Sequence, residues 1–530
     1  MNLIPWLLTA AQLHRPPPAW YPLHFIPTSD LVGILPLIVV GAGVVAVLLA
    51  DLLVRRPGHP VLPALSALIL VAGIGVVIGQ WVANPVHSLV FDGAFTDDRF
   101  ALFSDFVVLA TALAVVLLSP GYLRRRGLEE GEYYILLLAS VTGMLVLDGA
   151  TNLIVIFLGI ELLSIPLYVL AGFARGEHKS QEAALKYLLL GGFASGFLVY
   201  GMALLYGETG STMLTGIHAA LTRSVLHGPI DPMALAGLAL LAVGLLFKAS
   251  AAPFHWWTPD VYQGSPVLVT TFMSVATKVA AFTVLLRLFS ATFAPYRSEW
   301  EIPIALVAII SMVYGNVVAI AQSSVKRLLA YSGIAQAGYV LIGVALGRPD
   351  GTQASLYYLA IYAFMNTGAF AVVTILSRRG EDCDSYAELG GLGRRQPVLA
   401  GLMAVFMLSL AGFPLTAGFF GKLFLFAAAI HDGQLPLAIW GVLTSVVSLF
   451  YYLRVILVMY TSAPAPGTTS DAAGVLLQGA SGGEGKLAGA SSLSQVGLGV
   501  ISLAAAGTVV LGVFPTVIYG LLQGVSVVRG

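Results

Sequence analysis

The sequence contains few charged residues for its length. Only 10% of its 530 residues are Asp, Glu, Lys or Arg, whereas soluble globular domains carry about 25%. Apolar residues make up 58% and occur in long runs, most of them near the roughly 20 residues that a helix needs to cross a bilayer. Most of these runs have no polar face to turn towards water. The composition therefore predicts an all-α polytopic membrane protein.

Cysteine is nearly absent, and so are the usual cofactor motifs. The single cysteine, Cys383, has no intrachain disulfide partner and falls short of the roughly four thiolates that an iron–sulfur cluster takes. No Cys/His group has zinc spacing, and no glycine-rich stretch matches a dinucleotide loop. The formal net charge is zero, which gives no reason to expect nucleic acid as a partner. We expect no cofactor and no metal in this chain.

The apolar runs divide into about fourteen candidate spans. They cover residues 31–53, 62–82, 100–119, 133–150, 152–174, 185–206, 233–252, 267–289, 302–321, 328–347, 354–377, 398–430, 436–460 and 493–520. The opening residues 1–30 lack the basic start of a cleaved signal peptide, and their role stays open. A Gly-, Ser- and Ala-rich stretch over 461–492 predicts a flexible loop before a last span within 493–530.

Basic residues cluster in alternate loops. Arg124 to Arg126, Lys326 and Arg327, and Arg394 and Arg395 belong to one set, while the intervening loops hold isolated cations. The positive-inside rule places the first set on the cytoplasmic side. With an even number of spans, both termini then face the outside.

The middle of the chain divides into two blocks of similar length. Three spans within 1–132 precede a five-span block, 133–289, and a second five-span block, 302–460. Because five is odd, the second block runs with opposite topology, which predicts an inverted repeat of the kind found in transporters.

The fourth span of each block contains a helix breaker. Pro253 follows the first of these spans, and Gly412 and Pro414 interrupt the second. A single proline kink can be of no consequence, but paired interruptions at corresponding positions favour an ion pathway.

Four ionisable residues lie deep in apolar spans: Glu161, Lys248, Lys278 and Lys422. Each costs about 2.5–3.5 kcal/mol at the centre of a bilayer, so we expect them to face the protein interior, partners or water. Static ion pairing is the alternative. Glu161 can neutralise Lys248, but Lys278 and Lys422 then lack an obvious acid, which favours a conducting role.

Lysine suits proton transfer because burial disfavours its charged form and a nearby carboxylate restores it. The hypothesis is that Glu161 modulates Lys248, which passes protons through Lys278 towards Lys422 by way of water and polar side chains.

Several long motifs resemble one family. The segments LLFKASAAPFHWWTPDVYQGSP (245–266), TTFMSVATKVAAF (270–282), VKRLLAYSGIAQAGY (325–339), YLAIYAFMNTGAF (358–370) and LSLAGFPLTAGFFGK (408–422) are similar, in this order, to subunit N of respiratory complex I, the NADH:quinone oxidoreductase. The resemblance to its M and L paralogues and to multisubunit sodium/proton antiporters is weaker.

The resemblance implies a multi-pass subunit of a bacterial plasma membrane that translocates protons, driven by quinone reduction by NADH elsewhere in the complex. By motif, Glu161 is the glutamate of the fifth span, Lys248 the lysine of broken span seven, Lys278 that of span eight and Lys422 that of broken span twelve. It also implies other antiporter-like subunits as partners, and it places NADH, FMN, iron–sulfur clusters and quinone in other subunits.

Two positions depart from the family pattern. Gln263 stands where a glutamate is usual, in an expected cytoplasmic loop, and Gln336 stands where many members have histidine. Gln336 is a candidate water-path residue between the last two lysines, because an amide orients water although it holds no proton. His255 and Asp260 are candidates for proton uptake from the cytoplasm, or equally for capping a helix end.

Three other functions compete with a complex I subunit. They are a subunit of a sodium/proton antiporter, a membrane-arm subunit of a related hydrogenase complex, and a structural scaffold whose buried charges hold helices together. The residues of the quoted motifs disfavour the antiporter subunit. Lys278 and Lys422, which lack an obvious acid, disfavour the structural scaffold.

Overall fold

The computed structural model describes residues 27–54, 58–83, 89–128, 131–228, 230–377, 382–462, 488–525 and 527. Its elements, in chain order, are α2 (Thr28–Gly33), α3 (Leu35–Val54), α4 (Val61–Ala83), β1 (Leu89–Val90), β2 (Phe95–Thr96), α5 (Arg99–Arg126), α6 (Glu132–Asp148), α7 (Leu153–Ala171), α8 (His178–Thr209), α9 (Leu214–His227), α10 (Pro232–Lys248), α11 (Trp257–Gly264), α12 (Val267–Arg287), η1 (Leu288–Thr292), η2 (Ala294–Tyr296), α13 (Arg297–Ile320), α14 (Val325–Leu346), α15 (Pro349–Leu376), α16 (Tyr386–Leu389), α17 (Leu392–Arg395), α18 (Pro397–Ala411), α19 (Ala417–His431), α20 (Leu435–Thr461), α22 (Ala488–Val513) and α23 (Thr516–Leu522).

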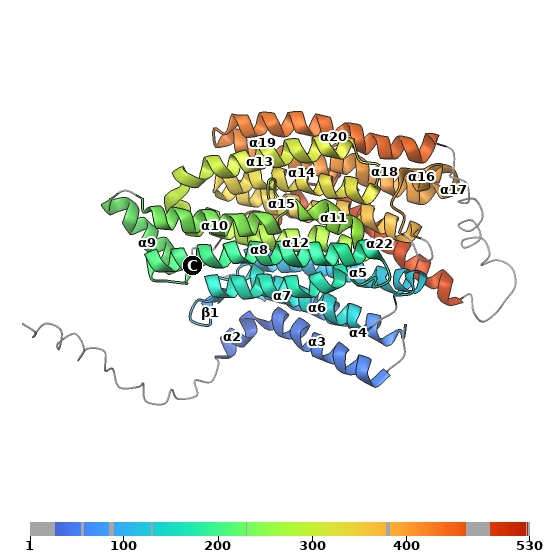
Figure 1. The fold of residues 1–530 in the computed structure, drawn as a ribbon, viewed down its shortest axis with the longest axis horizontal. Helices are drawn as coiled ribbons and strands as arrows, with labels where there is room; N and C mark the ends of the chain where they lie inside the picture. Colours follow the sequence, from blue (N-terminus) through green and yellow to red (C-terminus); the bar gives the residue numbers. More distant parts are fainter. Residues whose placement is uncertain are drawn as a thin grey trace, which may run out of the picture.

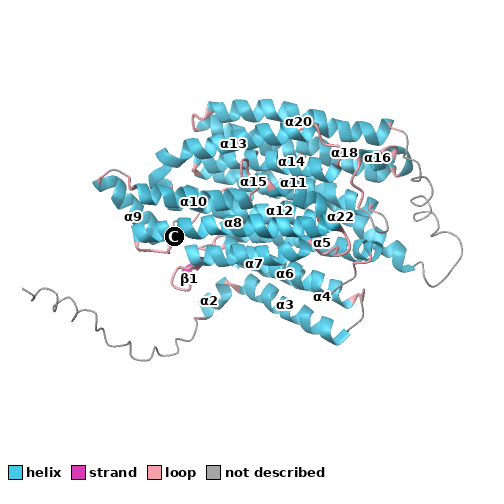
Figure 2. Cartoon of the chain, in the orientation of Figure 1, coloured by secondary structure: helices cyan, strands magenta, loops and turns pink. Residues whose placement is uncertain are grey.

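Long helices make up nearly the whole fold (Figures 1 and 2). Most of them lie side by side along one common axis, and within the described residues the only sheet is the short β1–β2 hairpin. Eleven described helices are long and apolar enough to cross a membrane. The remaining predicted spans fall on α6, on α10 and on the pair α18 with α19. The prediction of an all-α polytopic membrane protein is confirmed.

The centre of the bundle is formed by α12, α14 and α15. The apolar windows of α12 and α14 are completely buried, whereas that of α3, at the bundle's edge, is only 17% buried. Exposed large apolar side chains, such as Leu53, Phe193 and Leu503, lie on the peripheral helices. Such a surface suits lipid or neighbouring subunits, and it makes the central helices the part most remote from lipid.

Both predicted helix interruptions are present. The first separates α10 from α11 around Pro253, and the second separates α18 from α19, where Gly412 adopts a left-handed conformation (φ 87°) that ends α18. Each interruption also holds a non-glycine residue at positive φ, Ser250 at 62° and Leu415 at 68°. Strained residues of this kind persist where the surrounding structure holds them, which is common at functional sites.

Some boundaries differ from those predicted. The first span is split into the short α2 and the longer α3, which begins at Leu35. Most of the predicted loop 461–492 lies outside the described residues, but α22 already begins at Ala488. Residues 1–26 are likewise outside the described part, and the division into inverted repeats stays a prediction.

Candidate functional site

Lys248 is the last residue of α10, and its side chain is 4% exposed. Its ammonium donates to the hydroxyl of Ser164 on α7 at 2.8 Å and to the hydroxyl of Tyr187 on α8 at 3.0 Å. The Tyr187 ring is stacked on Trp257 of α11, with centroids 4.5 Å apart. Hydroxyls from two neighbouring helices therefore hold the lysine at the helix break.

Lys278 lies in the middle of α12 and is 2% exposed. Its ammonium donates to the carbonyl of Ala249 at 3.2 Å, which is the residue after Lys248. On the other side it packs against Gly333 of α14, where a Cβ added to the glycine would lie 3.5 Å from the lysine Cε. The hydroxyl of Tyr362 lies beside the same glycine and has no hydrogen-bond partner among the described residues.

Lys422 lies on α19, on the far side of the second helix break, and is 4% exposed. Its ammonium donates to the carbonyls of Leu410 and Ala411, at 3.2 and 3.1 Å, and lies 4.6 Å from the centre of the Tyr339 ring. These carbonyls belong to the last turn of α18, where the helix leaves its backbone acceptors unpaired.

Helix C-termini are a feature common to Lys278 and Lys422. Lys278 binds the end of α10, and Lys422 binds the end of α18. The partial negative charge of a helix C-terminus stabilises a cation, as in transporters with broken helices. No described residue forms an ion pair within 4.0 Å with Lys248, Lys278 or Lys422. Static ion pairing therefore does not account for these lysines.

Glu161 lies on α7, one turn before Ser164, and is half-buried rather than enclosed. It accepts a hydrogen bond of 2.5 Å from the hydroxyl of Ser195 on α8. Leu158 and Leu162, on the same side of α7, are exposed. Ser164 bonds Lys248, so the carboxylate lies one helical turn from a direct partner of the lysine.

Gln336 lies on α14 between the surroundings of Lys278 and those of Lys422. Its amide donates to the carbonyl of Leu410 at 3.2 Å, the same oxygen that Lys422 binds, and to the hydroxyl of Tyr452 at 3.1 Å. Its carbonyl oxygen accepts from Tyr358. One turn earlier, Ser332 is 2.5 Å from the Tyr452 hydroxyl. The predicted position on the path is therefore occupied by a hydrogen-bonded network.

His255 and Asp260 lie after the first break but have different surroundings. Asp260 on α11 forms ion pairs with Lys186 at 2.6 Å and with Arg327 at 2.7 Å. His255 is 6% exposed, its Nδ1 has no partner among the described residues, and its ring lies 4.6 Å from that of Tyr314. The structure does not bring the two side chains into contact, and Asp260 joins α11 to α8 and α14.

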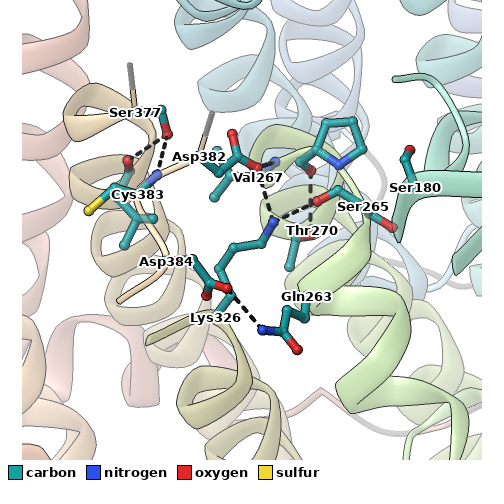
Figure 3. A network of polar contacts seen from close by, with 12 residues as sticks. Ser180, Gln263, Ser265, Val267, Thr270, Lys326, Ser377, Asp382, Cys383 and Asp384 are labelled. Atoms are coloured by element: carbon teal, nitrogen blue, oxygen red, sulfur yellow. Dashed lines mark hydrogen bonds and ion pairs between the residues drawn. The ribbon is translucent and has the colours of Figure 1, made fainter. Parts of the chain in front are cut away.

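A polar network lies at one end of the bundle, where Arg126, Lys326 and Arg327 form a basic cluster (Figure 3). We call this the basic end. Lys326 at the start of α14 donates to Asp382 at 3.0 Å and to the carbonyl of Ser265 at 2.7 Å. Asp382 also accepts from the Tyr122 hydroxyl at 2.7 Å and from the amide of Val267 at 3.2 Å. Burial alone would raise the pKa of the Asp382 carboxyl, but the cations of Lys326 and Arg126 lower it, and the net shift is downward.

Gln263 belongs to the same network and lies in α11 rather than in a loop. Its amide donates to Asp384 at 2.9 Å (Figure 3). Its carbonyl oxygen accepts from Arg327 at 3.2 Å. A glutamate in its place would accept from Arg327 but would have no donor for Asp384.

Sequence reasoning missed four uncharged side chains: Ser164 and Tyr187, which bind Lys248, and Ser332 and Tyr452, which belong to the network of Gln336. Serine and tyrosine occur throughout the apolar spans, and nothing in their spacing marks these four. The hydroxyl of Tyr358 also belongs to this network, because it binds Gln336. Among the described residues, no group of three or more His, Cys, Asp or Glu could hold a metal ion.

The chain is similar to known proteins over most of its length. The profile of a family described as "NADH:quinone oxidoreductase/Mrp antiporter, TM" matches residues 150–448. NADH-quinone oxidoreductase subunit N of Chloroflexus aggregans is 41% identical over 511 residues, which is 95% of this chain and 99% of the relative. Subunit N 1 of Solibacter usitatus is 40% identical over 489 residues, 92% of this chain and 95% of the relative.

Solved structures share the fold. A chain of respiratory complex I from Thermus thermophilus with bound aureothin is 32% identical, with a TM-score of 0.73, covering 92% of this chain and 99% of that chain. A chain of the Mrp complex from Dietzia sp. DQ12-45-1b has a TM-score of 0.75 at 23% identity, covering 93% of this chain and 95% of that one, a likeness in fold alone. The chain therefore belongs to the NADH:quinone oxidoreductase/Mrp antiporter family and, within it, to the subunit N group of NADH-quinone oxidoreductases.

Proposed function

We propose that this chain is a proton-translocating membrane-arm subunit of NADH:quinone oxidoreductase, and that Glu161, Lys248, Lys278 and Lys422 form its proton relay. The observation that carries the proposal is a set of three buried lysines that have no ion-pair partner among the described residues and lie at two broken helices. Lys248 ends α10, Lys278 binds the carbonyl of Ala249 after it, and Lys422 binds the last turn of α18. An unpaired buried ammonium is costly, so each lysine has a strong tendency to give up its proton to a nearby acceptor.

The relay begins at the first broken helix. Glu161 acts on Lys248 through the segment of α7 that carries Ser164. A carboxylate that approaches favours the charged lysine, and one that retreats favours proton release. Lys248 then passes its proton towards Lys278, whose ammonium already bonds the carbonyl of Ala249, the residue next to Lys248.

The second half of the relay runs along α14. A proton released from Lys278 moves past Gly333 and through the hydrogen-bonded groups of Ser332, Tyr452 and Gln336 to Lys422. Gln336 orients this network because it donates and accepts hydrogen bonds but does not take up a proton itself. His255 stands beside the first break as a group for proton uptake, whereas Asp260 positions α11.

Redox chemistry belongs to other subunits in this proposal. The chain has one cysteine, which is buried, and too few thiols for an iron–sulfur cluster. We therefore place NADH, FMN, iron–sulfur clusters and quinone in partner subunits, and we expect the other antiporter-like subunits to contact the exposed apolar helices.

Purification of the tagged chain from its native membrane tests the assignment. The expected product contains flavin and iron–sulfur absorbance and reduces quinone with NADH. A preparation with membrane subunits only and no redox centre would contradict the assignment and indicate a sodium/proton antiporter assembly instead.

The relay is tested in vesicles that contain the assembled complex. Lys248→Ala should abolish proton translocation, since the first buried proton carrier is lost. Lys179→Ala, a change of an exposed lysine at the start of α8, is the matched control and should leave translocation unchanged. Normal pumping by Lys248→Ala would disprove the relay.

A further inference from the structure

A second group of buried charges lies at the end of the bundle opposite the basic cluster. It consists of Asp98 before α5, Asp105 within α5, Asp148 at the end of α6 and Arg287 at the end of α12. Their exposed fractions are 1%, 5%, 0% and 2%. The proposed lysine relay does not use them.

Arg287 forms its ion pair with the carboxylate of Asp98. Its Nη1 and Nη2 donate to the two oxygens of Asp98 at 2.8 and 3.0 Å, the bidentate geometry preferred between guanidinium and carboxylate. Its remaining contact in this group is to the backbone carbonyl of Asp148, at 3.0 Å, and not to the Asp148 side chain. One positive charge thus faces three buried carboxyl groups.

Asp105 and Asp148 lie on the packed helices α5 and α6, and their carboxyl groups interact with each other. Oδ1 of Asp105 receives no hydrogen bond from a donor among the described residues, and the donor beside the Asp148 carboxyl is the Thr283 hydroxyl. The single proton of the Thr283 hydroxyl is shared among the Ser104 hydroxyl, the carbonyl of Val279 and the Asp148 carboxyl, so it satisfies only one of them at a time. Two facing carboxylates in a buried site do not both ionise, and a proton held between them supplies the missing donor.

Few other charges lie near the pair. The helices α4 and α22, which pack against α5, carry no acidic or basic residue. Asp97 and Arg99 lie at the same end, and the Arg99 guanidinium is 5.4 Å from the centre of the Trp81 ring. The remaining acidic and basic residues on the helices packed against α5 and α6 are Asp51, Arg124, Arg125, Arg126, Glu132, Glu161, Lys278 and Asp350.

The pair lies between the lysine relay and a small cavity. Thr283 follows Lys278 by five residues on α12, about 8 Å along the helix, and its hydroxyl bonds Ser104, the neighbour of Asp105. On its other side, Asp105 lines a water-sized cavity together with Asp97, Thr96 and the α2–α3 junction at Ile34. Polar groups around such a space are what an internal water requires.

We propose that Asp105 and Asp148 form a proton-binding pair that releases protons through this cavity at the end opposite the basic cluster. The release role rests on the proposed proton translocation, whereas the binding of a proton by the pair does not. The cavity gives Asp105 contact with water, and Asp148 holds the proton back in the apolar interior.

Infrared difference spectroscopy of the assembled complex, recorded as the pH is changed in H2O and D2O, tests proton binding. The wild-type complex should show a protonated-carboxyl band that shifts in D2O and disappears as the pH rises. Asp105→Asn and Asp148→Asn should each remove this band, because the amide donates the hydrogen bond that the shared proton supplied. Asp92→Asn, an exposed change at the same end, is the control and should keep it.

The release role has a separate readout. Both pair variants should lower the number of protons translocated per electron, while Lys248→Ala should abolish translocation and leave the carboxyl band intact. An unchanged band in both pair variants would overturn the proposal, whatever the outcome for Lys248. If the variants fail to assemble, the same spectra are recorded on wild-type complex labelled with ¹³C-aspartate. The absence of an isotope-shifted protonated-carboxyl band would then overturn the proposal.

Discussion

Gln336 and Lys422 donate hydrogen bonds to the same oxygen, the carbonyl of Leu410, each at 3.2 Å. The two side chains come from α14 and α19, and the shared acceptor belongs to the last turn of α18. The glutamine thereby connects the second broken helix to the tyrosine hydroxyls beside α14. If Lys422 moves or loses its charge, the hydrogen bond between Gln336 and this carbonyl changes as well.

Gln336→Leu should lower proton translocation while the complex still assembles. The change leaves the buried Tyr358 hydroxyl without its acceptor, at a cost of about 1–3 kcal/mol, removes one of the two partners of the Tyr452 hydroxyl, and breaks the link to Leu410. Proton translocation in vesicles is the measurement. Gln322→Leu at the end of α13 is the matched control. Undiminished translocation by Gln336→Leu would remove the network from the path.

Tyr187→Phe should shift the pH profile of proton translocation towards lower pH. The phenylalanine keeps the stacking on Trp257 but loses the hydroxyl that accepts from Lys248, a hydrogen bond to a charged group worth about 1.5–3 kcal/mol. The ammonium is then held less firmly, so loading with a proton requires a more acidic medium. Tyr206→Phe, an exposed position on the same helix, should leave the profile in place. A profile unmoved by Tyr187→Phe would exclude this hydroxyl from proton loading.

Gly421→Ala should disturb the site of Lys422 from the neighbouring position. A Cβ there would lie 2.3 Å from Ile361 Cδ1 and 2.7 Å from Tyr358 Cδ2, so the tyrosine that bonds Gln336 must move. Overpacking of this kind costs about 1–3 kcal/mol, and we expect lower thermal stability and lower translocation. Gly401→Ala, with open space around it, should be neutral or stabilising by about 1 kcal/mol. Equal behaviour of the two variants would contradict the close approach of α19 and α15.

Asp382→Asn should loosen the basic end of the bundle in a pH-dependent way. The folded pKa of Asp382 lies below its ordinary value of about 3.9, so its stabilising contribution is full well above that pH and is lost as the pH falls through the folded pKa. Breaking a buried ion pair costs about 3 kcal/mol, which should speed hydrogen exchange of the Val267 amide over a hundredfold at pH 7.

The difference in Val267 exchange between wild type and Asp382→Asn should stay constant above about pH 5 and narrow below it. Glu299→Gln, a change of an exposed acid on α13, serves as control and should not alter Val267 exchange. A difference that grows as the pH falls would contradict the sign of the shift.

The sequence by itself determined the membrane class, the helical spans and the four ionisable residues within them. Runs of apolar residues and isolated buried charges are local signals, and the free energy of transfer to a bilayer depends on each residue's own chemistry. The breaks near Pro253 and at Gly412 were equally local, since a helix breaker acts on its own turn.

Only the tertiary structure decided what each lysine binds. The partners of Lys248 come from α7 and α8, that of Lys278 from the end of α10, and those of Lys422 from the end of α18. Hydroxyls and helix-end carbonyls occur many times along the chain, and their role depends on which helices pack together. The pairing of Asp105 with Asp148 is of the same kind, because residues 43 positions apart become neighbours only when α5 and α6 pack side by side.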